Sequence, residues 1–235
     1  MKINPESTIY FRNQIKRESE KGAYPMSVNC VGKNISLKIF PEVFPPQQEF
    51  LLGEFVKNFP NLANAEVADI GTGSGIEAIS AALFGAKHVD AIDINPEALK
   101  CSKENAQINK VDEKITFILS DLFARIESSK KYDLILANLP FIDFDGGKDL
   151  IDLALYDNNH IIHKNFLAQA KKHLTNDGRI LLPHANLQSG KRENSNADFD
   201  GLEKMIIDAG YELQIIAEKP FRMDYKWRLY ELRIK

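Results

Sequence analysis

Short apolar segments alternate with stretches of helical periodicity through the middle of the chain. The helical stretches repeat apolar residues at three- and four-residue spacing, as in Ile76, Ile79 and Leu83, which predicts helices with one buried face. The predicted strands are 66–70, 88–93, 114–119, 132–137 and 178–183, and the predicted helices are 74–84, 96–109 and 160–174. Because strands separated by helices pair in parallel with right-handed crossovers, this pattern indicates an α/β fold with a parallel sheet.

The chain on either side of this core follows a different pattern. Before the core, apolar residues on both sides of Gly32-Lys33-Asn34 predict a β-hairpin. After it, the stretch 188–200 is rich in Ser, Asn and charged residues, and we expect a mobile loop on the ligand side. The other predicted elements are a helix over 47–58, a helix over 199–209 that ends at Gly210, and two strands over 211–217 and 227–234.

Composition and charge restrict the class of protein. With 235 residues, 44% of them hydrophobic, the chain is long enough for one folded domain with an extension. The net charge of −3 provides no general attraction for nucleic acid. Two cysteines make no disulfide framework, and no apolar run approaches the length of a membrane span. Together with a polar first 25 residues that show no secretory segment, these features favour a reducing, cytoplasmic location.

A glycine-rich run, Asp69-Ile70-Gly71-Thr72-Gly73-Ser74-Gly75, lies between a predicted strand and a predicted helix. Glycines at such a turn permit positive φ and let a ligand lie against bare backbone. The spacing is G-x-G-x-G, and Ile76 stands where the dinucleotide fingerprint requires its third glycine. No Gly-Lys-Ser/Thr follows, so the run is not a phosphate-binding P-loop. A carboxylate at Asp69 that points into the crevice would suit a cationic ligand and repel a pyrophosphate.

A second carboxylate, Asp93, ends the next predicted strand, 22 residues after Gly71. An acid at this place can accept both hydroxyls of a ribose. The alternative is that Asp93 caps the following helix. Asn95 stands at the better cap position, directly before Pro96, which leaves Asp93 for the ribose.

A third carboxylate, Asp121, follows the predicted strand over 114–119. It can bond the amino group of an adenine ring, with Leu122 and Ile94 packed against the ring faces. The alternative is a simple turn or helix cap at Ser120-Asp121. The three carboxylates and the glycine turn together indicate a site for a nucleoside that carries a positive charge.

Four segments, DIGTGSG, AIDINPEAL, SDLF and ANLPF, resemble the successive motifs of class I S-adenosylmethionine-dependent methyltransferases, over residues 45–185. The segment GAKHVDAIDINPEALKCSKENAQIN also resembles the ribosomal-protein lysine methyltransferases. The resemblance implies a Rossmann-like, seven-stranded, mostly parallel sheet with an antiparallel edge hairpin and helices on both faces. It implies S-adenosylmethionine as the cofactor. The residues implied to bind it are Asp69, Gly71, Thr72, Gly73, Gly75, Asp93, Ile94, Asp121, Leu122 and Asn138.

The tetrapeptide Asn138-Leu139-Pro140-Phe141 resembles the (N/D)PP(Y/F) motif of methyltransferases that act on planar or conjugated nitrogen, such as the release-factor glutamine enzymes. It departs from the motif at Leu139, where that family usually has proline. Two carbonyl acceptors, the Asn138 side chain and the Leu139 backbone, can localise the lone pair of such a nitrogen. Pro140 fixes the backbone and Phe141 offers a face for a planar substrate. The alternative is a strand end followed by a proline turn.

Two features after Phe141 have competing interpretations. The carboxylates there can favour a cationic substrate, but a solvated loop is the expected structure; they are Asp143, Asp145, Asp149, Asp152 and Asp157. His160 and His163 are three residues apart in a predicted helix, near the spacing of a metal pair. Because no third ligand follows at a defined spacing, we expect surface or packing histidines and no metal.

We expect residues 1–45 to form an extension that covers and selects the acceptor, and residues 46–235 to form the methyltransferase domain. The side chains expected around the acceptor are Tyr24, Phe44, Gln48 and Trp227, with residues 221–225. The sequence names no acceptor. Protein and small-molecule acceptors stay open, RNA is disfavoured by the negative charge, and the oligomeric state is not readable.

The sequence therefore predicts an N-methyltransferase that acts on an amide, amine or exocyclic amino nitrogen. A lysine amine or a small metabolite is an alternative acceptor, which the missing second proline and the acidic segment favour. Another alternative is a nucleoside-binding partner subunit without catalysis, against which Asn138 counts. An NAD-dependent oxidoreductase is disfavoured by the glycine spacing.

Overall fold

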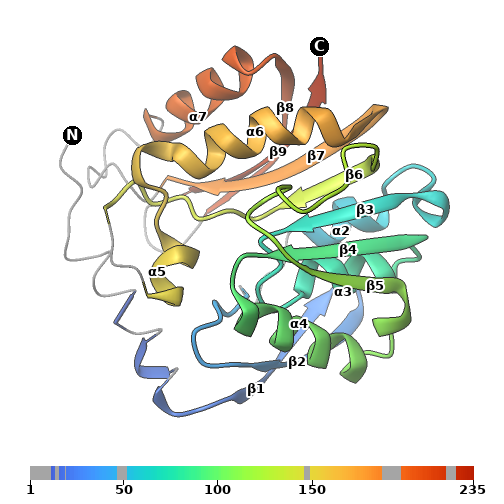
Figure 1. Cartoon of the computed structure of the whole chain (residues 1–235), viewed down its shortest axis with the longest axis vertical. Helices are drawn as coiled ribbons and strands as arrows, with labels where there is room; N and C mark the ends of the chain where they lie inside the picture. Colours follow the sequence, from blue (N-terminus) through green and yellow to red (C-terminus); the bar gives the residue numbers. More distant parts are fainter. Residues whose placement is uncertain are drawn as a thin grey trace.

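The computed structural model of the chain describes residues 12–13, 16–18, 20–46, 52–145, 149–186, 197–220 and 226–235. Its centre is a seven-stranded sheet in the order β5-β4-β3-β6-β7-β9-β8 (Figure 1). The strands are β3 (Glu66–Ile70), β4 (His88–Asp93), β5 (Ile115–Leu119), β6 (Tyr132–Ala137), β7 (Leu174–Ala185), β8 (Tyr211–Pro220) and β9 (Lys226–Ile234). Strands β3 to β7 pair in parallel, whereas β9 pairs antiparallel with both β7 and β8. The predicted fold class, with its antiparallel edge hairpin, is confirmed.

Helices cover both faces of the sheet. The α-helices are α2 (Leu52–Lys57), α3 (Ile76–Leu83), α4 (Pro96–Ile108), α5 (Leu150–Leu155), α6 (Ile161–His173) and α7 (Ala197–Asp208), with 3-10 turns at Leu62–Asn64, Asp112–Lys114 and Asn158–His160. Figure 1 shows α3 and α4 on one side of the sheet, with α6 and α7 on the other. Each side has its own apolar core, one around α3 and one around α6. None of the helices in the described ranges is long and apolar enough to cross a membrane.

The predicted hairpin, β1 (Tyr24–Cys30) and β2 (Lys33–Ile39), forms a separate two-stranded sheet. It packs against α4 through side-chain amides. The backbone N–H of Lys38 donates to Asn105 Oδ1 at 2.7 Å, and Asn109 Nδ2 donates to the backbone oxygen of Ser36 at 2.7 Å. Apolar side chains of the hairpin, such as Ile35 and Leu37, join the core around α3. The hairpin is therefore anchored to the main sheet domain.

The structure revises several predicted boundaries. The helix predicted from residue 74 begins at Ile76, because Gly75 takes the left-handed conformation at φ 85° and forms its N-cap. Strand β7 begins at Leu174, four residues earlier than predicted, and follows α6 directly. The predictions of a helix from residue 47 and of a loop over 188–200 fall in part on residues 47–51 and 187–196, which lie outside the described residues.

The prediction of a solvated acidic loop after Phe141 is wrong for part of the segment, although Asp145 and Asp149 are exposed as expected. Its middle forms α5, and the carboxylates of Asp152 and Asp157 are buried. Asp152 accepts hydrogen bonds from the guanidinium of Arg12, which also donates to Asp149 at 3.0 Å. Asp152 is buried because it pairs with a cation 140 residues away in the sequence, which a local reading of charge does not detect.

Candidate active site

The carboxyl ends of β3, β4 and β6 meet at one edge of the sheet, where they border a cavity of about 1230 Å³. Ligand crevices of open α/β sheets lie at this edge. The hairpin and the segment after it form the opposite wall, with Tyr24, Phe40 and Phe44 among the lining residues. Trp227 of β9 also lines the cavity. Gln48 and residues 221–225 lie outside the described residues, so the expectation for them is untested.

The glycine turn is held open by backbone hydrogen bonds to the neighbouring strand. The N–H groups of Gly71 and Thr72 both donate to the backbone oxygen of Ile92, at 2.8 and 3.0 Å. Gly71 and Gly73 have φ values of 75° and 53°, in the left-handed region that favours glycine. Gly71, Thr72 and Gly73 line the cavity and expose a short stretch of backbone to it.

Gly75 lies behind the cavity wall and is not among its lining residues. A Cβ at this position would lie 2.4 Å from Ser102 Oγ of α4 and 3.0 Å from the Ser102 Cα. The close packing of α3 against α4, together with a φ of 85°, requires glycine here. Its place in the structure is therefore that of a helix-packing glycine.

Asp69 is also absent from the cavity lining, in contrast to the expectation that its carboxylate points into the crevice. Its side chain is buried, and Oδ2 accepts from Thr72 Oγ1 at 2.6 Å and from the backbone N–H of Ala78 at 3.1 Å. The carboxylate thus ties the glycine turn to the first turn of α3. Burial, followed by the nearby charge of Glu77, raises the pKa of Asp69 well above its usual range.

Asp93 lines the cavity at the end of β4 and organises the backbone on both sides. Its Oδ2 accepts from the N–H of Gly73 at 2.9 Å, and its Oδ1 accepts from the N–H of Asn95 at 2.8 Å. Asn95 caps α4, since its side chain accepts from the N–H of Glu97 at 2.9 Å. The expectation that Asn95, and not Asp93, forms the cap is confirmed.

The remaining residues predicted around an adenine ring also border the cavity. Asp121 is exposed at its rim, beside Ile94 and Leu122. Leu122 has a positive φ of 47°, a strained conformation for a leucine that the surrounding structure must enforce. Ile94 is half exposed although it is a large apolar side chain, so it offers an uncovered apolar surface to the cavity.

Asn138 follows β6 and lines the same cavity, as do Leu139, Pro140 and Phe141. Its Nδ2 donates to Oε1 of Glu77 at 3.2 Å. Glu77, in the first turn of α3, is only 4% exposed, and burial raises its pKa to about 7. Glu77 is not identifiable as a site residue from the sequence. An acidic side chain in the first turn of a helix is common, because it interacts favourably with the helix dipole.

Backbone hydrogen bonds join the segment after Phe141 to the chain just before α6. The N–H of Ile142 donates to the oxygen of Leu155 at 3.2 Å, and the N–H of Asp157 donates to the oxygen of Ile142 at 2.9 Å. The Phe141 ring meets the edge of His184, with ring centroids 5.7 Å apart. The loop that carries Asn138 to Phe141 is therefore positioned by α5, the start of α6 and β7.

Comparisons with known proteins identify the family. Residues 54–140 match the family model for ribosomal protein L11 methyltransferase (PrmA). The Putative protein N5-glutamine methyltransferase MJ0928 of Methanocaldococcus jannaschii is 36% identical over 154 residues, which cover 58% of this chain and 75% of the relative. A release factor glutamine methyltransferase of Lactococcus lactis is 35% identical over 167 residues, 64% of this chain and 58% of the relative.

Solved structures share the fold. A ribosomal protein L11 methylase from Lactobacillus delbrueckii superposes with a TM-score of 0.60 at 22% identity, over 88% of this chain and 99% of that one. The T. thermophilus 16S rRNA methyltransferase RsmC, in complex with AdoMet and guanosine, gives a TM-score of 0.63 at 16% identity, over 91% and 51%. S-adenosylmethionine is the cofactor of this group. The chain belongs to the class I S-adenosylmethionine-dependent methyltransferases, in the family that contains the M. jannaschii relative.

Proposed function

We propose that this enzyme transfers the methyl group of S-adenosylmethionine to a nitrogen, and that the nitrogen is the side-chain amide of a glutamine in a protein. Two of the relatives are named as protein or release factor glutamine methyltransferases, which supports a protein amide. The placement of Asn138 at the cavity supports it independently, because an amide nitrogen needs hydrogen-bond acceptors to become nucleophilic.

The cofactor would lie against Gly71, Thr72 and Gly73, where bare backbone faces the cavity. Each carboxylate oxygen of Asp93 accepts one hydrogen bond from a backbone N–H. The remaining lone pairs can accept hydrogen bonds from the two ribose hydroxyls. Asp121 would accept from the adenine amino group, with Ile94 and Leu122 on the ring faces. Asp69 and Gly75 would act indirectly. Asp69 would hold the glycine turn in place, and Gly75 would let α4 pack closely against α3.

The observation that carries the acceptor proposal is the orientation of Asn138. Because its Nδ2 is bonded to Glu77, its Oδ1 is the atom left for an incoming N–H. The backbone oxygen of Leu139 would take the second hydrogen of a primary amide. Both acceptors favour the pyramidal, partly positive nitrogen that forms during transfer over the planar ground state. Pro140 and Phe141 would hold the backbone and cover one face of the amide.

The transfer itself is a displacement at carbon. The cofactor supplies a methyl group that is activated by its bond to a positively charged sulfur. The amide nitrogen held by Asn138 and Leu139 would form the new N–C bond with this methyl group, while the S–C bond would break with its electron pair on sulfur and leave S-adenosylhomocysteine. The nitrogen then loses one proton to water. This chain's residues mainly align the nitrogen with the methyl group, a contribution that can reach several kcal/mol.

We also propose that residues 1–45 cover and select the acceptor, as an extension of the methyltransferase domain at 46–235. In support, Tyr24, Met26 and Phe44 line the cavity opposite Asn138. Arg12, bonded to Asp152 of α5, ties the earlier part of the extension to the same side. Cys30 and Cys101 are free and buried, which fits a reducing cytoplasmic location.

The test is a transfer assay with radiolabelled S-adenosylmethionine and a whole-cell extract, followed by complete protease digestion of the labelled protein, which leaves side-chain N-methylamides intact. N5-methylglutamine supports the proposal, whereas label in lysine, in RNA or in small metabolites overturns the acceptor. Asn138→Ala should bind the cofactor normally and lose at least 90% of transfer. If the wild-type chain binds the cofactor but labels nothing, a binding subunit without catalysis is the better description.

A further inference from the structure

We propose that Asp157, His160 and His163, at the start of α6, form a binding site for a zinc ion or a similar divalent transition metal. The metal would brace the loop that carries Asn138 to Phe141. This departs from the expectation of surface or packing histidines, which rested on the lack of a third ligand in the sequence. The fold supplies that ligand, because Asp157 lies beside both histidines.

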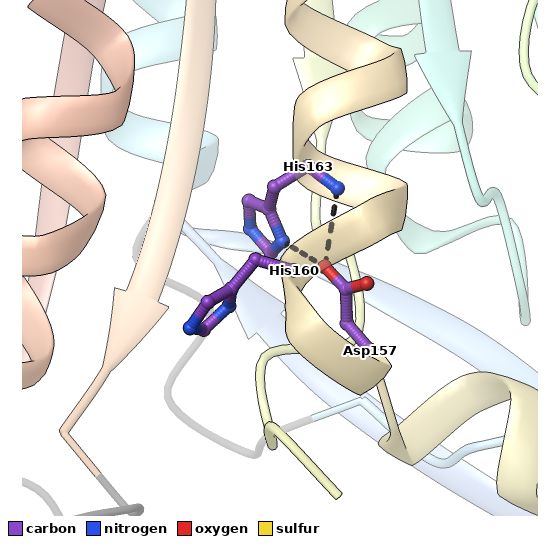
Figure 2. Close-up of side chains that lie close together, drawn as sticks. All are labelled: Asp157, His160 and His163. Atoms are coloured by element: carbon purple, nitrogen blue, oxygen red, sulfur yellow. Dashed lines mark hydrogen bonds and ion pairs between the residues drawn. The ribbon is translucent and has the colours of Figure 1, made fainter. Parts of the chain in front are cut away.

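The three side chains converge on one point. One ligand atom from each residue lies within 4.8 Å of those of the other two. Figure 2 shows one ring nitrogen of His163 turned toward the Asp157 carboxylate, with the His160 ring beside them. The His163 Nδ1 and Asp157 Oδ2 atoms are 2.7 Å apart. Asp157 and His163 are fully buried, so both groups sit in a medium that strengthens binding of a cation.

The backbone fixes this arrangement. The Asp157 carboxylate accepts from the N–H groups of Ile162 and His163, at 2.7 and 3.1 Å. Asn159 and His160 both have left-handed φ values, 56° and 54°, which turn the chain so that His160 returns beside Asp157. A helix N-terminus normally repels a cation. Here the carboxylate already occupies the first-turn N–H groups and offsets that field.

Two buried imidazole nitrogens beside this cluster lack a partner in the part of the chain that the structure describes. Among the described residues, neither His163 Nε2 nor His184 Nδ1 has a hydrogen-bond partner, although both atoms are buried. The two rings are perpendicular, with centroids 5.6 Å apart. An unsatisfied buried polar atom costs about 1–3 kcal/mol. Because Nδ1 of His163 faces Asp157, its Nε2 points away from an ion held there, and the proposed ligands remain Asp157, His160 and His163 Nδ1.

The chemistry of the donors selects the metal. Imidazole nitrogens and a carboxylate suit zinc, cobalt or nickel, whereas magnesium and calcium prefer oxygen ligands alone. Tetrahedral zinc at about 2.0–2.1 Å from each ligand places its ligand atoms about 3.3 Å apart. His160 is partly exposed and would rotate inward to meet this geometry. Asp157 Oδ2 and His163 Nδ1, which are 2.7 Å apart, would exchange their hydrogen bond for the metal: Nδ1 would lose its proton to water and the two atoms would separate to that distance.

The same segment is bonded directly to the catalytic loop. The N–H of Asp157 donates to the oxygen of Ile142 at 2.9 Å, and the N–H of Asn159 donates to Asp143 Oδ1 at 2.6 Å. Ile142 follows Phe141 in the chain. A metal that fixes Asp157 and His160 would therefore also fix the backbone just after the acceptor-binding residues.

The test uses the untagged full chain, stripped with a chelator and titrated with Zn²⁺ or Co²⁺ by calorimetry and visible spectroscopy. We expect one equivalent to bind, with intense tetrahedral Co²⁺ bands and a higher melting temperature. Hydrogen exchange at residues 138–143 should slow. Mg²⁺ should neither bind saturably, nor raise the melting temperature, nor slow this hydrogen exchange. His160→Ala should weaken Zn²⁺ binding at least tenfold, and His88→Ala, a histidine on β4, should not.

Asp157→Asn is the second variant, because asparagine keeps a capping oxygen for α6 and loses the charge. It should fold and bind Zn²⁺ at least tenfold more weakly. The proposal is overturned if the folded wild-type chain binds neither ion saturably, or if His160→Ala and Asp157→Asn bind as tightly as the wild type. In that case Asp157 is only the helix cap and His163 its hydrogen-bonded neighbour.

Discussion

Asn138 donates a hydrogen bond from Nδ2 to Oε1 of Glu77 at 3.2 Å, across 61 residues of sequence. The contact joins the end of β6 to the first turn of α3, and both residues line the cavity. An asparagine amide can rotate by half a turn and exchange its oxygen with its nitrogen. The Glu77 carboxyl accepts but does not offer a matching donor when it is ionised, so it selects the orientation that presents Asn138 Oδ1 to the acceptor.

Glu77→Ala should therefore lower kcat, while binding of S-adenosylhomocysteine, whose sulfur is neutral, is retained. Without the acceptor on Glu77, the Asn138 amide is free to flip or tilt, and misplacement by about 1 Å can cost on the order of a hundredfold in rate. We expect a ten- to hundredfold loss of kcat, measured at saturating S-adenosylmethionine. Glu77 is a positioning residue in this scheme, since it acts through Asn138.

Glu77→Gln is the matched control for this prediction. Its side-chain oxygen can accept the same Asn138 hydrogen, although its NH2 group also permits the reversed amide, so the loss of kcat should be clearly smaller than that of the alanine variant. If the alanine and glutamine variants lose the same amount of activity, or if the alanine variant keeps full activity, Glu77 does not position Asn138.

Asp93→Ala should weaken cofactor binding at least tenfold. The substitution removes the acceptor for the N–H of Gly73 and for the N–H of Asn95, and with them the carboxylate proposed to bind the ribose. Calorimetric titration with S-adenosylhomocysteine measures the effect. Asp177→Ala, at an exposed position near the start of β7, serves as the control and should leave the dissociation constant unchanged. An unchanged constant for Asp93→Ala would contradict the ribose assignment.

The sequence was sufficient for the parallel core and for most of the cofactor side. Periodicity located all five parallel strands, and glycine spacing located the turn between β3 and α3, because both signals are local. Gly71, Asp93 and Asp121 line the cavity, as expected. The direction of the Asp69 side chain was not predictable, since it depends on hydrogen bonds with Thr72 and Ala78 that form only when α3 starts at Ile76.

Features that depend on distant partners were missed. Glu77 is visible as functional only once β6 brings Asn138 to it. The burial of Asp152 depends on Arg12, and that of Asp157 on the first turn of α6. A run of acids otherwise reads as a solvated loop. In each case the missing information is a contact between residues whose side chains meet only in the folded chain.

Gly75→Ala should destabilise the protein strongly. The new Cβ would lie 2.4 Å from Ser102 Oγ, and alanine would be held at a φ of 85°. The left-handed conformation alone costs about 1–2 kcal/mol, and the contact with α4 adds to it. We expect a loss of at least about 2 kcal/mol in the free energy of unfolding, measured by urea denaturation. Gly201→Ala, in α7 with open space at its Cβ, is the control and should be neutral or stabilising.

Binding of S-adenosylmethionine should strengthen as the pH rises from 6 to 8. Burial raises the pKa of Glu77 to about 7, so this carboxyl is largely protonated at pH 6 and ionised at pH 8. The ionised form attracts the positively charged sulfur, and we expect a gain in affinity of up to about tenfold over this range. S-adenosylhomocysteine has the same amino acid and nucleoside but a neutral sulfur, so its affinity should change less.

The stability of the free protein should change in the opposite direction with pH. Because the folded-state pKa of Glu77 lies above its ordinary value of 4.5, the folded chain binds this proton more tightly than the unfolded chain. The contribution of Glu77 to stability is therefore present below about pH 4.5, falls as the pH rises toward 7 and is constant above it. Glu77→Gln should flatten both profiles, measured by calorimetric titration and by urea denaturation at each pH. Wild-type and glutamine profiles that coincide would show that Glu77 does not titrate in this range.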